Sequence, residues 1–297
     1  MKAPVTRRAF LQTTLAAAGS QLAGPVSIQT ANMDSQSKTA KENGLIDTNI
    51  TLGRWPFRRL PLEDTAALVA RLKRHGVSQA WAGSFEAIFS RDLAAANARL
   101  VEDCHRHGRS WLLPFGSVNL MLPDWEEDFR SGVELHGMRG LRLHPNYHGY
   151  TLDDPAFVKL LSLATERRLV VQIAADMEDE RTQSRLAQVP HVDTKPLLAL
   201  LKDLPGARLE LLNWHRAVPN DVVKQLAAAG VGFDIATVEG VGGVAKLSEQ
   251  ISGKRVMFGS HAPLFYFESA ALKLKESALG AEDLRAVREL NAGRCLA

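Results

Sequence analysis

Histidine, carboxylate and amide side chains recur in this sequence at the ends of short apolar runs. Asp47 and Asn49 close one such run. His144 closes the run in "GLRLHPNYHGY", and His261 follows the run in "FGSHAP". Imidazoles and carboxylates exchange protons and bind divalent metals, so a place where they meet is a candidate for catalysis. We therefore take Asp47, His144 and His261 as candidate catalytic residues.

Two arginines near the same runs could bind an anionic substrate. Arg54 follows the first run and Arg142 lies within "GLRLHP". A guanidinium holds a carboxylate through paired hydrogen bonds. If Arg142 points into the protein it needs a carboxylate partner, and Asp47 or Asp234 could supply one. The expected substrate-binding residues are Asn49, Arg54, Arg142, Asn146, Tyr147, Gln172, Asn213 and His215.

The elements that would position these side chains alternate regularly along the chain. Eight apolar runs without clean alternation predict strands that are covered on both sides. Helical patterns separate them; one, over residues 154–168, begins with a capping aspartate and Pro155. The expected strands are 45–49, 77–82, 111–118, 140–144, 169–174, 208–213, 231–236 and 255–260.

Eight strand–helix repeats fit two architectures. A doubly wound sheet usually carries a glycine-rich phosphate turn after its first strand, and none follows residues 45–49. The count and the length fit an α/β fold of the (β/α)8 type, a TIM barrel, better. The sequence predicts one barrel domain over residues 44–297, with an extra helix from about residue 281. The candidate side chains, together with Asp176 and the acidic residues after it, would then meet at the barrel's C-terminal mouth.

The first 43 residues differ from the rest. Lys2, Arg7 and Arg8 precede a short apolar stretch with small residues, which is the layout of a signal peptide. The segment "RRAFL" resembles the twin-arginine export motif. We therefore expect a signal peptide and linker over residues 1–43, and a periplasmic or exported protein. The apolar stretch is too short for a stable membrane span, so the mature protein is expected to have none.

The charge balance argues against a nucleic-acid partner. The formal net charge is +3, and Lys2, Arg7 and Arg8 are the only charged residues before Asp34. Without that segment the charge is 3 − 3 = 0. No basic patch therefore indicates nucleic-acid binding. The two cysteines give no disulfide framework.

Three segments resemble the amidohydrolase superfamily, specifically its amidohydrolase-related branch. They are "GMRGLRLHPNYHGYTLDDPAF", "KRVMFGSHAP" and, with departures, "IDTNITLG". The resemblance covers nearly all of residues 44–296. It implies a barrel hydrolase or decarboxylase that normally holds one divalent metal, often zinc.

The chain departs from that branch at the usual metal positions. "DTN" at residues 47–49 stands where the branch has two histidines spaced one apart. Gln172 stands for a fifth-strand histidine, and His261 for the eighth-strand aspartate. Asparagine and glutamine are poor zinc ligands. Asp47, His144 and His261 are an alternative set of metal ligands, although the fourth strand lies across the barrel from the first and eighth. The other interpretation is a pocket that binds no metal.

Two functions follow from these features. The first is an exported enzyme that hydrolyses or decarboxylates a small polar, carboxylate-bearing substrate, with His261 as general base or metal ligand and Asp47 orienting it. The second is a metal-free, non-catalytic protein that binds a small ligand in the same pocket. The segment at residues 53–61, "GRWPFRRLP", is expected to fold over the mouth. A homodimer is left open.

Overall fold

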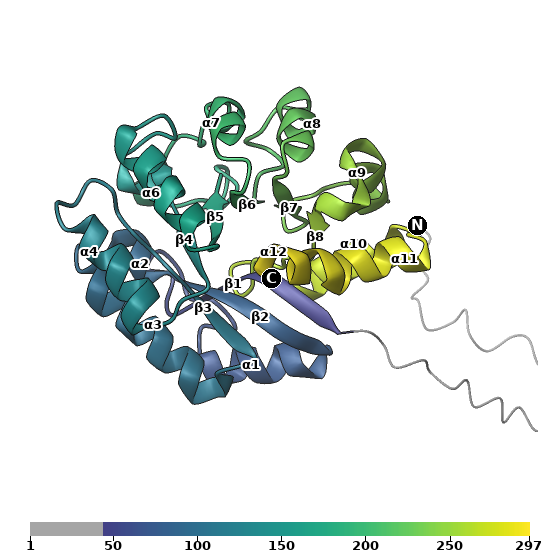
Figure 1. The fold of residues 1–297 in the computed structure, drawn as a ribbon. Coiled ribbons are helices and arrows are strands. Elements are labelled where there is room, and N and C mark those ends of the chain that lie inside the picture. Colours follow the sequence, from purple (N-terminus) through teal and green to yellow (C-terminus); the bar gives the residue numbers. More distant parts are fainter. Residues whose placement is uncertain (1–43) are drawn as a thin grey trace, which may run out of the picture. The chain divides into compact units, whose positions relative to one another are not determined.

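The computed structural model describes residues 44–297. The signal peptide and linker expected over residues 1–43 lie outside the described residues. In the described part, eight parallel strands follow one another in chain order around a barrel, and helices surround them (Figure 1). The predicted TIM barrel is confirmed. The strands are β1 (Leu45–Leu52), β2 (Val77–Ser84), β3 (Leu112–Gly116), β4 (Gly140–Leu143), β5 (Val170–Ala174), β6 (Arg208–Leu212), β7 (Gly232–Asp234) and β8 (Val256–Met257).

Backbone hydrogen bonds close the barrel between β1 and the segment after β8. The Thr48 amide donates to the Phe258 carbonyl at 2.9 Å, and the Thr51 amide donates to the Ala262 carbonyl at 2.9 Å. β1 also bulges: Asp47 pairs with Ala80 of β2, but Ile50 already pairs with Ala82. The extra residue re-aims the side chains around it, as bulges commonly do near functional sites.

The outer helices begin where the sequence supplies caps. Asp64 accepts a hydrogen bond from the first turn of α1, and Asp92 does the same for α3. Asp154 caps α6 ahead of Pro155, as predicted. The helices between the strands are α1 (Thr65–Arg74), α2 (Glu86–Phe89), α3 (Leu93–Gly108), α4 (Trp125–Arg130), α5 (Pro145–His148), α6 (Pro155–Glu166), α7 (Leu197–Asp203), α8 (Asn220–Ala228) and α9 (Gly243–Ile251).

A helical run follows β8, and its part from Ala281 onward is the predicted C-terminal addition. The run comprises α10 (Phe267–Glu276), α11 (Ala281–Arg285), a π-helical turn and α12 (Asn291–Leu296). The Phe258 amide donates to the Val287 carbonyl at 3.0 Å, and the Asn291 side chain donates to the Val256 carbonyl at 2.6 Å. The run is therefore bonded to the last strand.

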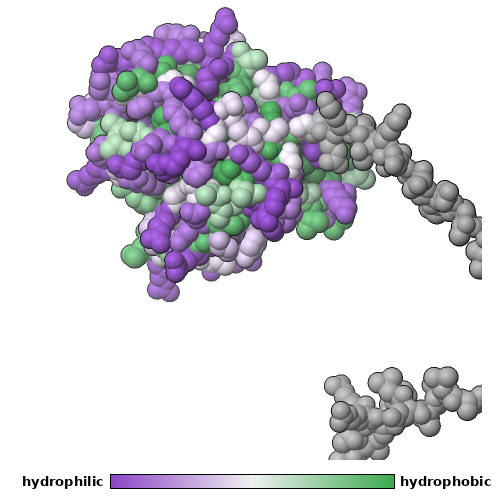
Figure 2. Space-filling view, turned by 90° about the horizontal axis from the view of Figure 1, so that it is seen from below, coloured by the Kyte–Doolittle hydropathy of each residue, from purple (hydrophilic) through white to green (hydrophobic). Residues whose placement is uncertain are grey.

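Apolar side chains from the strands and the inner helix faces form one large core between sheet and helices. On the face in Figure 2, hydrophobic areas are small and hydrophilic residues surround them. Among residues 44–297, no helix combines the length and apolarity needed to cross a membrane.

Candidate active site

Arg142 lies in the barrel interior, where every N–H of its guanidinium donates a hydrogen bond to another residue of the protein. Nε donates to Gln172 at 2.9 Å, and the two amino groups donate to the carbonyls of Ile50 (2.5 Å), Thr48 (3.0 Å) and Trp81 (3.1 Å). The remaining N–H reaches a threonine hydroxyl at 3.3 Å. A guanidinium has five N–H donors. All five have partners, so Arg142 has none left for the substrate carboxylate that the sequence suggested.

Gln172 and Glu210 continue this interior layer on the next two strands, in register with Arg142. Gln172 donates to the Thr48 carbonyl and to Glu210, both at 2.7 Å. Thr48 donates to the other Glu210 oxygen at 2.5 Å. Burial raises the pKa of Glu210 to about 8. Gln172 therefore holds Arg142, Thr48 and Glu210 together and does not face a substrate. Arg142 forms no hydrogen bond with Asp47 or Asp234, the two carboxylates that the sequence suggested as its partners.

Sequence reasoning missed Glu210. Its signal was a single glutamate within the otherwise apolar run of β6, a position where an unpaired carboxylate would be costly. Its partners are Gln172 and Thr48, and Thr48 is 162 positions away in the sequence.

A second buried network lies at the C-terminal mouth. Asn49 donates to Asp234 at 2.7 Å and to the Asn213 side-chain oxygen at 3.0 Å. The backbone N–H of Asn213 donates to the second Asp234 oxygen at 3.0 Å. Burial raises the pKa of Asp234 to about 6. The predicted convergence of Asn49 and Asn213 is thus present, but they bond mainly to each other and to Asp234.

His261 belongs to the same network. Its Nε2 lies 2.9 Å from the Met177 carbonyl, an acceptor, so Nε2 carries the proton and donates. Nδ1 lies 3.5 Å from the Asn213 side-chain nitrogen. Burial lowers the pKa of His261 to about 4. A neutral imidazole with so low a pKa is a weak general base at neutral pH, in contrast to the role expected from sequence.

His261 and Asn213 also share an unusual backbone conformation. Their φ angles are 58° and 54°, in the left-handed region that non-glycine residues seldom adopt. The His261 amide donates to the Asn49 carbonyl at 2.7 Å, which helps to hold this conformation. Such strained residues cluster at functional sites.

Asp47 is buried behind this network. One carboxylate oxygen accepts from the Asn49 amide at 3.1 Å and from the Ser260 amide at 3.0 Å. The other oxygen, Oδ2, is buried and has no hydrogen-bond partner among the described residues. Burial raises the pKa of Asp47 to about 7.

The expected metal set does not assemble. Within residues 44–297, no three His, Cys, Asp or Glu side chains are arranged to hold a metal ion. His144 Nδ1 and Asp47 Oδ2 are both buried without a partner in this part of the chain, but His261 Nε2 is committed to the Met177 carbonyl. Burial also holds the pKa of His144 well below its usual value. Asp47, His144 and His261 therefore do not fit a catalytic metal, which needs three converging protein ligands.

A loop after β1 covers part of the mouth, as predicted from "GRWPFRRLP". The Trp55 indole donates to Glu178 at 3.1 Å, and Arg58 donates to the other Glu178 oxygen at 2.5 Å and 3.1 Å. Trp55 packs with Phe85 and Leu264 in an apolar cluster. We call this arrangement the cap. It ties the loop after β1 to the loop after β5.

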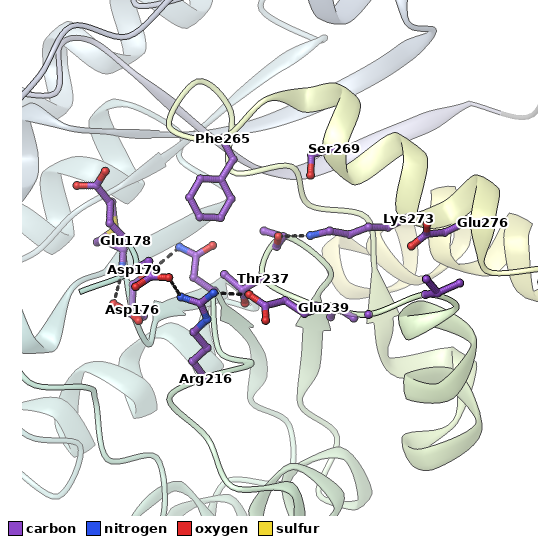
Figure 3. A pocket seen from close by; sticks show the side chains of 16 residues that line it. Asp176, Glu178, Asp179, Arg216, Thr237, Glu239, Phe265, Ser269, Lys273 and Glu276 are labelled. Atoms are coloured by element: carbon purple, nitrogen blue, oxygen red, sulfur yellow. Dashed lines mark hydrogen bonds and ion pairs between the residues drawn. The ribbon is translucent and has the colours of Figure 1, made fainter. Parts of the chain in front are cut away.

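Beside the cap, a cavity of about 480 Å³ opens over the ends of β5 to β8. Its lining includes Asp176, Asn213 and Arg216, and Figure 3 shows Arg216 between Asp179 and Glu239, with which it forms ion pairs. His261 contacts the lining residues Asn213, Met177 and Phe265. The cavity therefore adjoins the buried mouth network, and Asn213 belongs to both.

Asp176 is the lining carboxyl most suited to proton transfer. Its Oδ1 accepts from the Met177 amide at 2.7 Å, and its Oδ2 lies 3.4 Å from His191 Nδ1. Burial raises its pKa, while the Met177 hydrogen bond, His191 and Arg216 act in the opposite direction. Carboxyls with a raised pKa in a cleft are candidate catalytic groups.

The other predicted binding residues lie apart from this cavity. Arg54 is exposed and pairs with Glu63 at 3.3 Å. Asn146 donates to the Pro190 carbonyl at 3.1 Å, and the Tyr147 hydroxyl accepts from a glutamine side chain at 2.8 Å. His215 is half-buried against Trp214. None of these four residues lines the cavity.

Comparison with known proteins gives a family and a fold. A family model described as Amidohydrolase matches residues 56–297. No curated protein matches the chain significantly. Three similar solved structures are a 2,6-dihydroxybenzoate decarboxylase from Rhizobium, a 5-carboxyvanillate decarboxylase from Sphingomonas paucimobilis, and a dihydroxybenzoic acid decarboxylase from Polaromonas with bound manganese.

The likeness to these structures concerns the fold. Sequence identities are 13%, 14% and 12%, and TM-scores are 0.64, 0.67 and 0.66, in the same order. Each alignment covers 86% of this chain and 98%, 99% and 97% of the other.

Proposed function

Because the chain belongs to the amidohydrolase family, whose model matches residues 56–297, we propose that it is an enzyme that hydrolyses or decarboxylates a small polar substrate in the cavity over β5 to β8. The observation that carries this proposal is the Asp176 carboxyl, which lines the cavity with a raised pKa close to the Arg216 guanidinium.

Asp176 and Arg216 suit two different parts of such a reaction, proton transfer and stabilisation of negative charge. In hydrolysis, Asp176 accepts a proton from the attacking water and returns it to the leaving group. In decarboxylation, the protonated form of Asp176 delivers its proton to the carbon from which CO₂ departs. Arg216 stabilises the negative oxygen that develops on the substrate in either reaction. No step is assigned to a metal at Asp47, His144 and His261, because these residues do not converge.

The charges of the cavity limit the substrate. The lining has five carboxyl side chains (Asp176, Glu178, Asp179, Glu239 and Glu276) and two cations, Arg216 and Lys273. A substrate carboxylate could bind Arg216 in place of Glu239, whose side chain is 58% exposed. We propose one substrate carboxylate at most, because further negative charge would meet the remaining acids.

Asp176→Asn is expected to lower kcat about 100-fold or more, since it removes proton transfer and keeps the shape of the side chain. The measurement is turnover of a panel of amides, lactones, β-keto acids and hydroxybenzoates, with Glu249→Gln, an exposed carboxyl outside the cavity, as control. The same assays before and after chelation, with metal analysis of the protein, test metal dependence. Unchanged turnover in Asp176→Asn would remove this mechanism.

A non-catalytic ligand-binding protein is the second candidate. It is favoured by the closed hydrogen bonding of Asn49, Asn213 and Asp234, which leaves little free polar chemistry at the buried mouth. A compound that raises the melting temperature while no member of the panel is turned over would support it.

Export is proposed from the sequence alone. Arg7 and Arg8 would direct the folded protein through the twin-arginine pathway. Replacing both arginines with lysine is expected to keep the protein in the cytoplasmic fraction. Its continued appearance in the periplasmic fraction would contradict this route.

A further inference from the structure

A second cavity, of about 570 Å³, lies at the opposite end of the barrel from the proposed active site. Its lining includes the first residues of β6 and β7, the residues just before β8, and α12. We infer that this basic cavity binds a small molecule that carries two or more phosphate groups. The inference is independent of the proposed function, because the two cavities share no residue.

The charge of the basic cavity is the first argument. Arg208, Lys254, Arg255 and Arg294 line it, and no aspartate or glutamate does. None of the four takes part in the ion pairs found among residues 44–297. Four cations without an acidic partner in one hollow are therefore an arrangement that an anion would complete.

The arginines of the cavity are anchored but not saturated. Arg208 donates one N–H to the Arg168 carbonyl at 3.1 Å, and Arg255 donates one to the Gly230 carbonyl at 2.9 Å. Arg294 donates to the side-chain oxygen of Asn291. A guanidinium with one anchored amino group keeps a defined orientation and retains several N–H donors. Such donors match the oxygen atoms of a phosphate.

The shape and the wider charge favour a small ligand over a nucleic acid. A cavity of this volume lies within the range of small-molecule sites, roughly 300–1,000 Å³. Residues 44–297 carry no net charge, since the whole +3 of the chain lies in residues 1–43 (3 − 3 = 0). The positive charge is thus local and concave, whereas nucleic-acid binding uses an extended basic surface. Four cations suit two or more phosphate groups better than one.

Titration calorimetry with inorganic pyrophosphate at low ionic strength tests the inference. The wild-type protein is expected to bind pyrophosphate more tightly than orthophosphate or citrate. The double variant Lys254→Gln/Arg294→Gln, which changes two exposed side chains, is expected to bind pyrophosphate about tenfold or more weakly. The double variant Lys224→Gln/Lys246→Gln removes two exposed lysines outside the cavity and is expected to bind within about twofold of wild type.

Three results would overturn the inference. They are no binding of pyrophosphate by the wild type, equal loss in both double variants, and citrate binding as tight as pyrophosphate, which would point to carboxylates instead. Melting temperatures of both variants show whether the fold is kept. A pyrophosphate-dependent rise in melting temperature in the wild type and the control variant, absent from Lys254→Gln/Arg294→Gln, is the matching second readout.

Discussion

Arg142→Met is expected to lower the free energy of unfolding by roughly 3–5 kcal/mol, because it removes five hydrogen bonds from the barrel interior and leaves their buried acceptors unpaired. The measurement is chemical denaturation followed by circular dichroism. Arg54→Met is the matched control. Its side chain is 75% exposed and its one ion pair is at the surface, so the change should stay below about 0.5 kcal/mol.

The same pair of variants separates structure from substrate binding. If Arg142 held a substrate carboxylate, Arg142→Met would raise KM and leave the unfolding curve close to that of the wild type. That outcome would contradict the contacts described here. Arg142→Lys is expected to fall between the two, because an ammonium has three donors where the guanidinium has five.

Asp47→Asn is expected to gain stability relative to the wild type as the pH rises from about 4 to 7. The pKa of the Asp47 carboxyl is about 7 in the folded protein and 3.8 without the protein environment. The folded state therefore binds the proton more tightly, and the wild type loses stability as the pH rises through this window. Three pKa units correspond to roughly 4 kcal/mol. The amide stays neutral throughout, so the variant does not share this loss.

Melting temperatures of both proteins between pH 4 and pH 8 measure the effect. The difference between them should widen up to about pH 7 and then become constant. Asp179→Asn is a control with the opposite sign, because Arg181 and Arg216 hold the pKa of Asp179 below its ordinary value. Its difference from the wild type should stay constant between pH 4 and pH 8 and shrink only as the pH falls below about 4, where the wild type loses this contribution. If the melting temperatures of Asp47→Asn and the wild type change in parallel with pH, ionisation of Asp47 does not destabilise the folded protein, and the prediction is wrong.

The fold was predictable from local sequence. Apolar runs predict all eight strands, since strands covered on both sides leave a continuous hydrophobic signal. The C-terminal helix and the loop over the mouth were also predicted, and both are present. The alternation of Arg142 with Leu141 and Leu143 leaves two directions open, into the barrel or toward the helices, and the hydrogen bonds to the carbonyls of β1 and β2 decide for the barrel.

The site was less predictable because its bonding is long-range. Sequence places Arg142 and Gln172 at strand ends but does not show that the side-chain N–H groups of both residues donate to a backbone carbonyl of β1. It places His261 at the mouth but does not show that its Nε2 donates a hydrogen bond to the Met177 carbonyl. Asp176 was visible after the fifth strand, but burial decides its pKa. Nor does any sequence pattern join Arg208, Lys254 and Arg294.

The cap has a consequence for how this barrel could acquire new substrates. Glu178 receives hydrogen bonds from Trp55 and Arg58, so one carboxylate fastens the loop after β1 across the mouth. The cavity over β5 to β8 is left to loops that take no part in the Arg142 layer. Mutations in those loops can reshape the cavity while the interior scaffold stays intact. Selection for a new substrate would therefore act on the cavity loops, while the hydrogen bonds around Arg142 keep the barrel interior unchanged.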